Sequence, residues 1–199
     1  MSDHILLTGG LGQVGSYLCE ELVQNGHVVT ILDNLSSSSK NPYPPEANFV
    51  KGDIRDAGLV NILVSNADIV IHCAAQIYVS RSMEDPVFDA QNNVLGTVNL
   101  LNAARKASIK RFVYFSSAAT YGDTVHLPVS ESHPQEPLSP YGASKLAGEK
   151  YALMFHRAYG LPTTSIRPFN IYSPRQDPSN PYSGVISKFI DKVHDNKPP

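Results

Sequence analysis

Cysteine is scarce in this chain of 199 residues. Its two cysteines, Cys19 and Cys73, lie far apart in the sequence, which excludes a framework of several disulfides. We expect two buried free thiols in a reducing cytoplasm, with one disulfide between them as the less favoured alternative. The fold must therefore depend on a hydrophobic core, for which a hydrophobic content of 42% is ample.

An excess of charge of one sign is also missing. Lysine and arginine number 16 against 18 aspartates and glutamates, giving a formal net charge of −2, and the basic residues are scattered. Nucleic acids and anionic membrane surfaces attract proteins through clustered basic residues. We therefore expect neither of them as a partner.

Long apolar runs, internal repeats and low-complexity segments are absent as well. No run approaches the roughly 20 apolar residues that span a bilayer, so no membrane association is expected. The start, Met1-Ser2-Asp3-His4, leads straight into an apolar segment and does not resemble a signal peptide. The length fits one domain, or one domain and part of a second, and we expect a cytoplasmic protein.

Three glycines follow the first apolar run at a spacing of three residues. Ile5–Thr8 is typical of a buried parallel strand, and from Gly12 onward apolar residues recur every three or four positions, as in a helix. At such a turn Gly9 permits a tight bend, Gly12 lets a pyrophosphate approach the backbone, and Gly15 lets the helix lie close to the sheet. The free N–H groups of the new helix add an anion site. A plain tight turn is the alternative interpretation.

A second β-rich run, 27–32, ends at Asp33. An acidic residue about 20 positions after the glycines, at the tip of the second strand, is placed to accept hydrogen bonds from an adenosine ribose. Its charge would repel a 2′-phosphate, which favours NAD over NADP. The alternative is that Asp33 only opens the turn 33–36.

Strands and helices alternate through the rest of the chain. Further strands are expected at 49–50, 69–75, 111–115 and 163–167, helices at 57–65, 87–107, 141–159 and 185–193, and loops at 34–47, 76–86 and 127–140. This order predicts an α/β fold, a doubly wound parallel sheet of the Rossmann type. Ligands bind such sheets beyond the carboxyl ends of the strands.

Two polar positions near these strands allow more than one interpretation. Asp53 and Ile54 are placed to contact an adenine, while either Asp53 or Asp56 is placed to cap the helix that follows. His72 has no partner at the spacing of a metal site, so we expect a buried imidazole with its hydrogen bonds satisfied, and no metal site.

Tyr141 and Lys145 are four residues apart on a predicted helix and so share one face. An ammonium near a phenol favours the phenolate, and we expect Lys145 to lower the pKa of Tyr141 from about 10 toward neutrality. The phenolate would take a proton from a substrate hydroxyl while hydride leaves for a nicotinamide. Ser117, at a strand end, is placed to hydrogen-bond the same hydroxyl. An ordinary solvated helix surface is the alternative.

The chain resembles the extended short-chain dehydrogenase/reductases of the NAD-dependent epimerase/dehydratase family, and is most similar to the UDP-glucose 4-epimerases. The segments that carry this resemblance are Thr8–Gly15, Asp33–Ser36, Gly52–Ile54, His72–Gln76, Asn93–Thr97, Ser116–Gly122, Tyr141–Lys145 and Arg167–Tyr172. They follow one another in order along the whole chain.

The resemblance implies Ser117, Tyr141 and Lys145 as the catalytic residues. The NAD contacts that it implies are Gly9, Gly12, Gln13, Val14, Gly15, Asp33, Asn34, Asp53, Ile54, Ala74, Ala75, Gln76, Asn93, Tyr141, Lys145 and Pro168. The substrate contacts that it implies are Ser117, Tyr141 and Asn170, the last near the diphosphate of the sugar nucleotide.

The activity implied is the interconversion of UDP-glucose and UDP-galactose through a 4-keto sugar, with NAD retained. The family's 4,6-dehydratases carry an Asp-Glu pair where this chain has Ala118 and Ala119, so elimination of water lacks its acid and base. A UDP-glucuronate 4-epimerase or decarboxylase, and a non-catalytic NAD-binding scaffold or sensor, remain as alternatives. The resemblance also implies a homodimer formed through helices 87–107 and 141–159.

Members of this family usually run well past the length of this chain. We therefore expect an NAD-binding Rossmann domain at 1–166 and the start of a substrate-binding lobe at 167–199, with most of that smaller lobe absent. Such a fragment keeps the cofactor site and lacks much of the sugar-nucleotide pocket, and its activity is in doubt.

Overall fold

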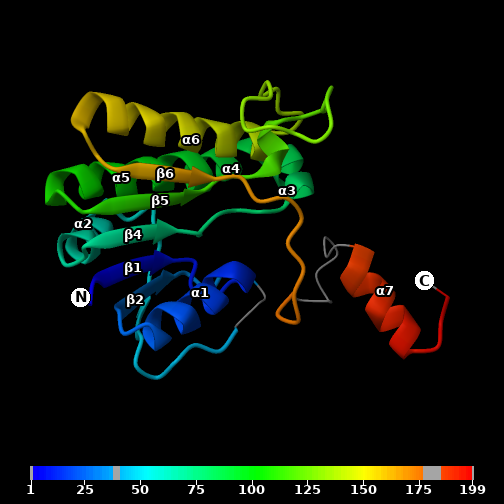
Figure 1. Ribbon diagram of the computed structural model, residues 1–199, viewed down its shortest axis with the longest axis horizontal. Coiled ribbons are helices and arrows are strands. Elements are labelled where there is room, and N and C mark those ends of the chain that lie inside the picture. The colour runs from blue at the N-terminus through cyan, green and yellow to red at the C-terminus, as the bar shows by residue number, and fades with distance from the viewer. Residues whose placement is uncertain (1, 38–40, 177–184, 199) are drawn as a thin grey trace.

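A six-stranded parallel sheet forms the centre of the computed structural model, which describes residues 2–37, 41–176 and 185–198 (Figure 1). The strands are β1 (His4–Thr8), β2 (Val28–Asp33), β3 (Asn48–Lys51), β4 (Ile69–His72), β5 (Arg111–Phe115) and β6 (Thr163–Ile166). Their order is β3-β2-β1-β4-β5-β6, and every neighbouring pair is parallel. The winding reverses between β1 and β4, so the doubly wound fold predicted from the sequence is confirmed.

Helices cover both faces of this sheet. They are α1 (Gln13–Gln24), α2 (Ala57–Ser65), α3 (Val79–Glu84), α4 (Pro86–Ala90), α5 (Gly96–Ala107), α6 (Pro140–Tyr159) and α7 (Val185–His194). α1 packs on one face, whereas α2, α5 and α6 pack on the other, and α7 stands apart from the sheet (Figure 1). Of the described helices, none combines the length and apolar character of a membrane span.

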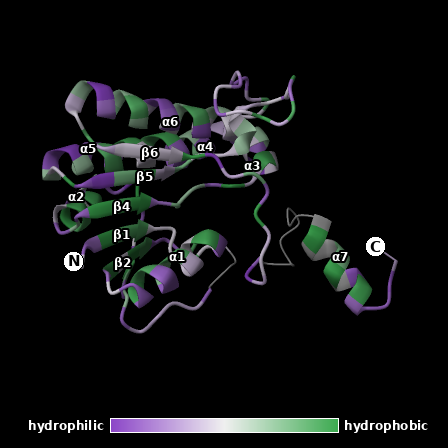
Figure 2. Cartoon of the chain, viewed as in Figure 1, coloured by the Kyte–Doolittle hydropathy of each residue, from purple (hydrophilic) through white to green (hydrophobic). Residues whose placement is uncertain are grey.

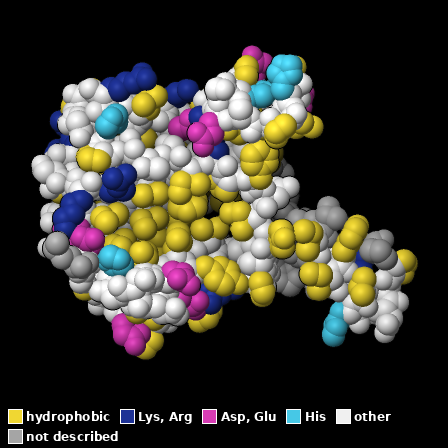
Figure 3. Space-filling view, viewed as in Figure 1, with side chains coloured by type: hydrophobic (Ala, Val, Ile, Leu, Met, Phe, Trp, Pro, Cys, Tyr) yellow, Lys and Arg dark blue, Asp and Glu magenta, His cyan; other side chains and the backbone are white. Residues whose placement is uncertain are grey.

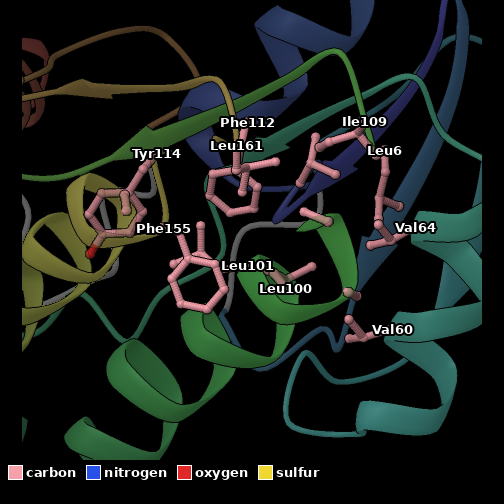
Figure 4. Close-up of a cluster of buried hydrophobic side chains, with 14 of the residues drawn as sticks. Leu6, Val60, Val64, Leu100, Leu101, Ile109, Phe112, Tyr114, Phe155 and Leu161 are labelled. Atoms are coloured by element: carbon pink, nitrogen blue, oxygen red, sulfur yellow. The ribbon is translucent and has the colours of Figure 1, made fainter. Parts of the chain in front are cut away.

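The alternation of side chains along the strands divides the core into two clusters. In β1, Leu6 belongs to the larger cluster with α2, α5 and α6, and the next residue, Leu7, belongs to the smaller cluster with α1. Figure 4 shows the larger cluster, where Leu100 and Leu101 of α5 meet Phe112 of β5. The inner strands β1, β2 and β4 are coloured largely hydrophobic in Figure 2, whereas β6 at the edge is pale, and hydrophobic inner strands are typical of a parallel sheet buried on both faces.

The face of β5 and β6 on the side of α1 is less well covered. Val113 and Phe115 of β5 are half-buried on this side, and Ile166 of β6 is 40% exposed. Figure 3 shows hydrophobic side chains gathered on this side of the molecule. Among the described residues no helix packs on this part of the sheet.

Helix α6 has the ends that its sequence encodes. The hydroxyl of Ser139 accepts a hydrogen bond from the backbone N–H of Gly142 at 3.1 Å, and Pro140 occupies the first turn. Gly160 ends the helix with φ of +72°, a conformation that glycine adopts without strain. These residues fix both ends of the helix that carries Tyr141.

Three differences from the sequence prediction exceed a shift of one residue at an end. The segment 76–86, expected to be a loop, contains helix α3, because buried Ser82 accepts a hydrogen bond from the N–H of Tyr141 and so docks this turn on α6. The predicted helix 87–107 is divided into α4 and α5 by a π turn, Gln91–Leu95. β4 ends at His72, before the predicted end at residue 75.

His72 occupies the core in the state expected from the sequence. Its ring is 2% exposed and is hydrogen-bonded through Nδ1 to Thr8 Oγ1 at 2.8 Å and through Nε2 to Thr97 Oγ1 at 2.9 Å. Burial, helped by the nearby charge of Lys145, lowers the pKa of His72 from 6.5 to about 3. The ring is therefore neutral in the folded protein at every pH above this value.

We predict that His72 makes the protein less stable in mild acid. Below pH 6.5 the unfolded chain binds a proton that the folded chain does not accept, so stability falls continuously down to about pH 3. Between pH 7 and pH 5 this amounts to about 2 kcal/mol of unfolding free energy. Urea unfolding at both values should show that H72Q lacks this loss, whereas a variant of the exposed His126, H126Q, retains it. Equal losses in wild type and H72Q would contradict the prediction.

Candidate functional site

A cavity of about 330 Å³ opens at the carboxyl ends of β1, β2 and β4. It is lined by eleven of the residues predicted to bind a cofactor, namely Gly9, Gly12, Gln13, Val14, Gly15, Asp33, Asn34, Ile54, Ala74, Ala75 and Gln76. The glycine turn, the end of β2 and the segment after β4 therefore meet in one hollow. This is the place that the strand order predicts for a ligand.

Backbone packing in the glycine turn leaves no room for side chains. Gly9 has φ of +70°, and a Cβ there would lie 2.6 Å from the backbone nitrogen of Ala74. A Cβ on Gly15 would lie 2.2 Å from the carbonyl oxygen of Gly9. The turn thus brings β1, the start of α1 and the segment after β4 into direct backbone contact, as the sequence suggested for Gly9 and Gly15.

The N-terminus of α1 faces the same cavity. Gly12 is its N-cap and provides no side-chain oxygen to accept from the N–H groups of the first turn. These groups, on Gln13, Val14 and Gly15, have no partner within the helix. Positive partial charge at this end of a 12-residue helix makes it a suitable place for a pyrophosphate.

Asp33 has the turn-forming role considered for it, and its predicted contact with a ribose stays a prediction. Its carboxylate accepts hydrogen bonds from the N–H groups of Leu35 at 2.9 Å and Leu11 at 3.1 Å, so it shapes the turn after β2. It also lines the cavity. The Leu11 bond fixes the carboxylate beside the glycine turn, within the region where a ribose would lie.

Of the roles considered for Asp53 and Asp56, the structure shows the helix cap, made by Asp56, and the contact of Asp53 with an adenine stays a prediction. Asp56 caps α2 by accepting from the N–H groups at positions 58 and 59. Asp53 pairs with Arg55 at 2.8 Å and accepts from Asn34 at 2.9 Å, and these contacts, above all that with Arg55, lower its pKa. Asp53 does not line the cavity, although Ile54 does. The side chain of Asp53 therefore acts on the cavity through Asn34.

Several cavity residues were not predicted from the sequence. They are Leu32, Ser36, Ser37, Gly52, Cys73, Ile77, Tyr78, Arg81, Phe88, Asn92, Ile171, Arg175 and Gln176. Cys73 and Gly52 are direct sequence neighbours of predicted residues, so extending each predicted segment by one residue would have included them. Arg81 belongs to α3, in the segment taken for a loop, and its guanidinium lies over the ring of Phe88 at 4.1 Å.

The segment 171–176 reaches the cavity by crossing α1. Gln13 donates to the hydroxyl of Ser173 at 3.0 Å, and Arg175 lies over the ring of Tyr17 at 4.0 Å while pairing with Glu20. Gln13, Tyr17 and Glu20 form one stripe of α1. These contacts join residues more than 150 positions apart, so no local pattern in the sequence predicts them.

Ser117, Tyr141 and Lys145 are brought together by the packing of α6 on the turn after β5. A Cβ on Gly142 would lie 2.6 Å from the carbonyl oxygen of Ala119, so the first turn of α6 presses directly on this turn. Burial raises the pKa of Tyr141, and the hydroxyl of Ser117, which lies near the phenol, opposes this rise. Lys145 follows one helical turn later and is 4% exposed.

The three residues do not line the cavity themselves, but hydrogen bonds join the cavity wall to α6, which carries Tyr141 and Lys145. Gln76, in the cavity wall, donates from its backbone N–H to Asn93 Oδ1 at 2.8 Å. Asn93 in turn donates to the hydroxyl of Ser144 at 3.1 Å, and Ser144 lies between Tyr141 and Lys145 in α6. Asn93 thus connects the cavity to the helix instead of lining it.

The predicted lowering of the pKa of Tyr141 is wrong. Burial raises the pKa of the phenol, and the charge of Asp89 adds to this rise, while Ser117 opposes it. Burial also lowers the pKa of Lys145 to about 8, opposed by Cys73 and Asp89. The prediction rested on the attraction between lysine and phenolate. The loss of water around both groups, which depends on burial in the folded protein, has the larger effect on their pKa values.

Pro168 and Asn170 follow β6. The carbonyl of Pro168 accepts a hydrogen bond from the N–H of Ala118 at 2.9 Å, which places this proline beside the turn that begins at Ser117. Asn170 is exposed two residues further on, and neither residue lines the cavity. Their predicted contacts with nicotinamide and diphosphate stay predictions.

The fold and the cavity define a Rossmann-type α/β protein with a dinucleotide-binding turn. Residues 5–199 match the NAD dependent epimerase/dehydratase family, and the chain belongs to that family.

Known proteins with similar sequence or structure extend this assignment. The chain is 48% identical over 197 residues to the putative UDP-glucose 4-epimerase of Methanocaldococcus jannaschii, covering 98% of this chain and 64% of that protein. The UDP-N-acetylglucosamine 4-epimerase of Methanobrevibacter ruminantium, solved with UDP-N-acetylmuramic acid, superposes with a TM-score of 0.93 at 36% identity, covering 100% of this chain and 64% of that one.

A third relative was solved with a cofactor. The UDP-glucose 4-epimerase of Thermus thermophilus in complex with NAD superposes with a TM-score of 0.89 at 36% identity, covering 98% of this chain and 64% of that one. The chain thus spans 64% of the length of each of these three proteins.

We predict that G15A opens the glycine turn. The added methyl would lie 2.2 Å from the carbonyl oxygen of Gly9, so α1 must move away from β1, and we expect a loss of about 2–3 kcal/mol in unfolding free energy. Urea unfolding measures this loss. The matched control is G58A in α2, where the new Cβ would lie 3.3 Å from the side-chain atom Asp56 Oδ1, which needs to move by only a few tenths of an ångström, and alanine favours the helix. Equal stabilities of G15A and wild type would refute the crowding.

Proposed function

We propose that this chain is the dinucleotide-binding part of a nucleotide-sugar epimerase that interconverts UDP-glucose and UDP-galactose. The observation that carries the proposal is the grouping of Ser117, Tyr141 and Lys145 beside the cavity that contains the glycine turn. Binding alone requires none of these three residues. Relatives named as UDP-glucose 4-epimerases support the choice of reaction.

The residues around the cavity fit NAD. The side-chain-free cradle at Gly9 and Gly15 and the unpaired N–H groups at the start of α1 suit a pyrophosphate. The carboxylate of Asp33, held by two backbone N–H groups, suits the ribose hydroxyls of an adenosine and disfavours a 2′-phosphate. A relative that was solved with NAD supports this choice of cofactor.

In the proposed reaction Tyr141 accepts the proton of the sugar 4-hydroxyl and later returns it. Bound NAD would supply the chemistry of hydride acceptance and return at the sugar C4. Ser117 hydrogen-bonds the oxygen that changes between hydroxyl and carbonyl and opposes the rise that burial causes in the pKa of Tyr141, and Lys145 provides a buried amine one helical turn from the phenol. Ala118 and Ala119, which follow Ser117, provide no acid or base for eliminating water. This favours an epimerase over a dehydratase.

The domain division proposed from the sequence is compatible with the fold. β6 ends at Ile166 and completes the sheet, and the segment 171–176 that follows lies against α1 and the cavity. We place the NAD-binding domain at 1–166 and assign 167–199 to the start of a substrate-binding lobe.

We further propose a homodimer formed through α5, α6 and the helical turns before α5. A shallow apolar groove crosses α4, the π turn, the start of α5 and α6. Val87 is 65% exposed, Leu95 49% and Tyr151 40% within it. Contact with a second copy would bury these side chains.

We predict that Y141F abolishes turnover without releasing the cofactor. Removing the phenolic proton acceptor should lower kcat for UDP-glucose and UDP-galactose exchange roughly 10²–10⁴-fold. The full-length protein, assayed without added NAD, gives the rate, and absorbance of released NAD after denaturation gives occupancy. A matched control is Y159F at the exposed end of α6. Absence of exchange with any nucleotide sugar, despite bound NAD, would favour a scaffold.

We predict that D33S changes the choice of dinucleotide. Loss of a charged hydrogen-bond acceptor should weaken NAD binding roughly 10–100-fold, while loss of the repulsion leaves NADP less disfavoured. Calorimetric titration with both dinucleotides measures the ratio of affinities. The control is D123S in an exposed loop. An unchanged NAD to NADP ratio in D33S would show that Asp33 does not face the ribose.

A further inference from the structure

Asp89 is a buried carboxylate without a cationic partner in contact among the described residues. Its side chain, in α4, is 1% exposed. Oδ1 accepts hydrogen bonds from Gln76 Nε2 at 2.8 Å and from Asn93 Nδ2 at 3.2 Å. Oδ2 is also buried, and no described residue donates a hydrogen bond to it. Placing a charge here opposes folding, because two neutral amides replace only part of its hydration.

The two hydrogen bonds do not require a charge. An asparagine at this position would offer the same acceptor oxygen to Gln76 and Asn93. What an asparagine would lack is the negative charge.

The charge of Asp89 acts on the helix that carries the proposed catalytic pair. α4 packs against α6, and the carboxylate raises the pKa of Lys145, opposing the effect of burial. It also raises the pKa of Tyr141 and that of Tyr114 in β5. Each direction is that of a negative charge close to a buried group.

The other ionisable groups around Lys145 come from the strands. Cys73, directly after β4, raises the pKa of the lysine as Asp89 does, and the ring of Tyr114 lies 4.6 Å from its Nζ. His72 of β4 is held neutral partly by the charge of Lys145. Because burial raises the pKa of the Cys73 thiol to about 12, that thiol is uncharged near neutrality. Among the described residues, Asp89 is thus the carboxyl group that acts on Lys145.

We propose that Asp89 is a positioning residue for the Tyr141 and Lys145 pair. Its hydrogen bonds hold Gln76 and Asn93, which form the wall between the cavity and α6, and its charge keeps Lys145 in the ammonium form. Asn93 continues this connection through Ser144, whose hydroxyl donates to the carbonyl of Tyr141 at 3.0 Å. The catalytic meaning of the proposal rests on the proposed function, whereas the effect on Lys145 does not.

The test is a direct titration of Lys145 in the chain labelled with ¹³C at lysine Cε. The resonance of Lys145 is assigned by its absence in K145R, and its midpoint is measured by NMR in wild type and in D89N. We expect a midpoint near 8 in wild type, lower by roughly half to one pH unit in D89N. Neither NAD nor a sugar is needed, so failure here is distinct from failure of the proposed function.

The matched control is D85N, which removes the same charge four residues earlier. Asp85 is exposed and caps α4 by accepting from the N–H of Phe88 at 2.9 Å, and asparagine serves equally well as a cap. The Lys145 midpoint should not move in D85N. Thermal unfolding of D89N should be unchanged or shifted upward, because a buried unpaired charge is removed while the acceptor oxygen stays.

Three results would overturn the proposal. The first is a Lys145 midpoint in D89N within 0.2 pH units of wild type (roughly the smallest shift that such a charge would give). The second is an equal shift in D85N. The third is a failure of both D89N and the smaller neutral variant D89S to fold, since Asp89 would then be required for the fold itself. If only D89S folds, its Lys145 midpoint decides.

Discussion

Direct contact between backbone segments at the glycine turn is the constraint on which the rest of the structure depends. The carbonyl of Gly9 lies where a Cβ of Gly15 would be, and the backbone of Ala74 lies where a Cβ of Gly9 would be. These contacts set the spacing between β1, β4 and the start of α1. Since the ends of β2 and β4 are aligned with β1 by the parallel register, the same contacts bring Asp33 and the segment after β4 to the cavity. A single turn thereby determines where a dinucleotide can lie.

The position of α6 on β5 depends on a second set of close contacts. A Cβ on Gly148 would lie 2.3 Å from the hydroxyl of Tyr114, and that hydroxyl donates to the carbonyl of Lys145 at 3.2 Å. The helix therefore lies deep against the strand, and this depth is what buries Lys145. Burial lowers the pKa of the lysine, and a nearby negative charge opposes that effect. The same packing that places the proposed catalytic pair thus also sets its protonation.

The sequence predicted most of the fold because its signals are local. The glycine spacing, the acidic residue after the second strand and the caps of α6 each act within a few residues of the structure that they specify. Eleven of the predicted cofactor residues line the cavity for this reason. The misses have the opposite origin. Helix α3 depends on docking to the N–H of Tyr141, the cavity role of Arg175 depends on Tyr17 and Glu20, and the pKa of Tyr141 depends on burial. None of these can be read from neighbouring residues.

Cys73 gives the cavity wall a chemical property of its own. Its side chain is half-buried and lines the cavity beside Ala74, and burial raises the pKa of the thiol to about 12. A cysteine attacks peroxides, electrophilic reagents and disulfides as the thiolate, and a thiol with so high a pKa forms little thiolate at neutral pH. A sulfur atom therefore adjoins the proposed nicotinamide dinucleotide site mainly as the neutral thiol near pH 7.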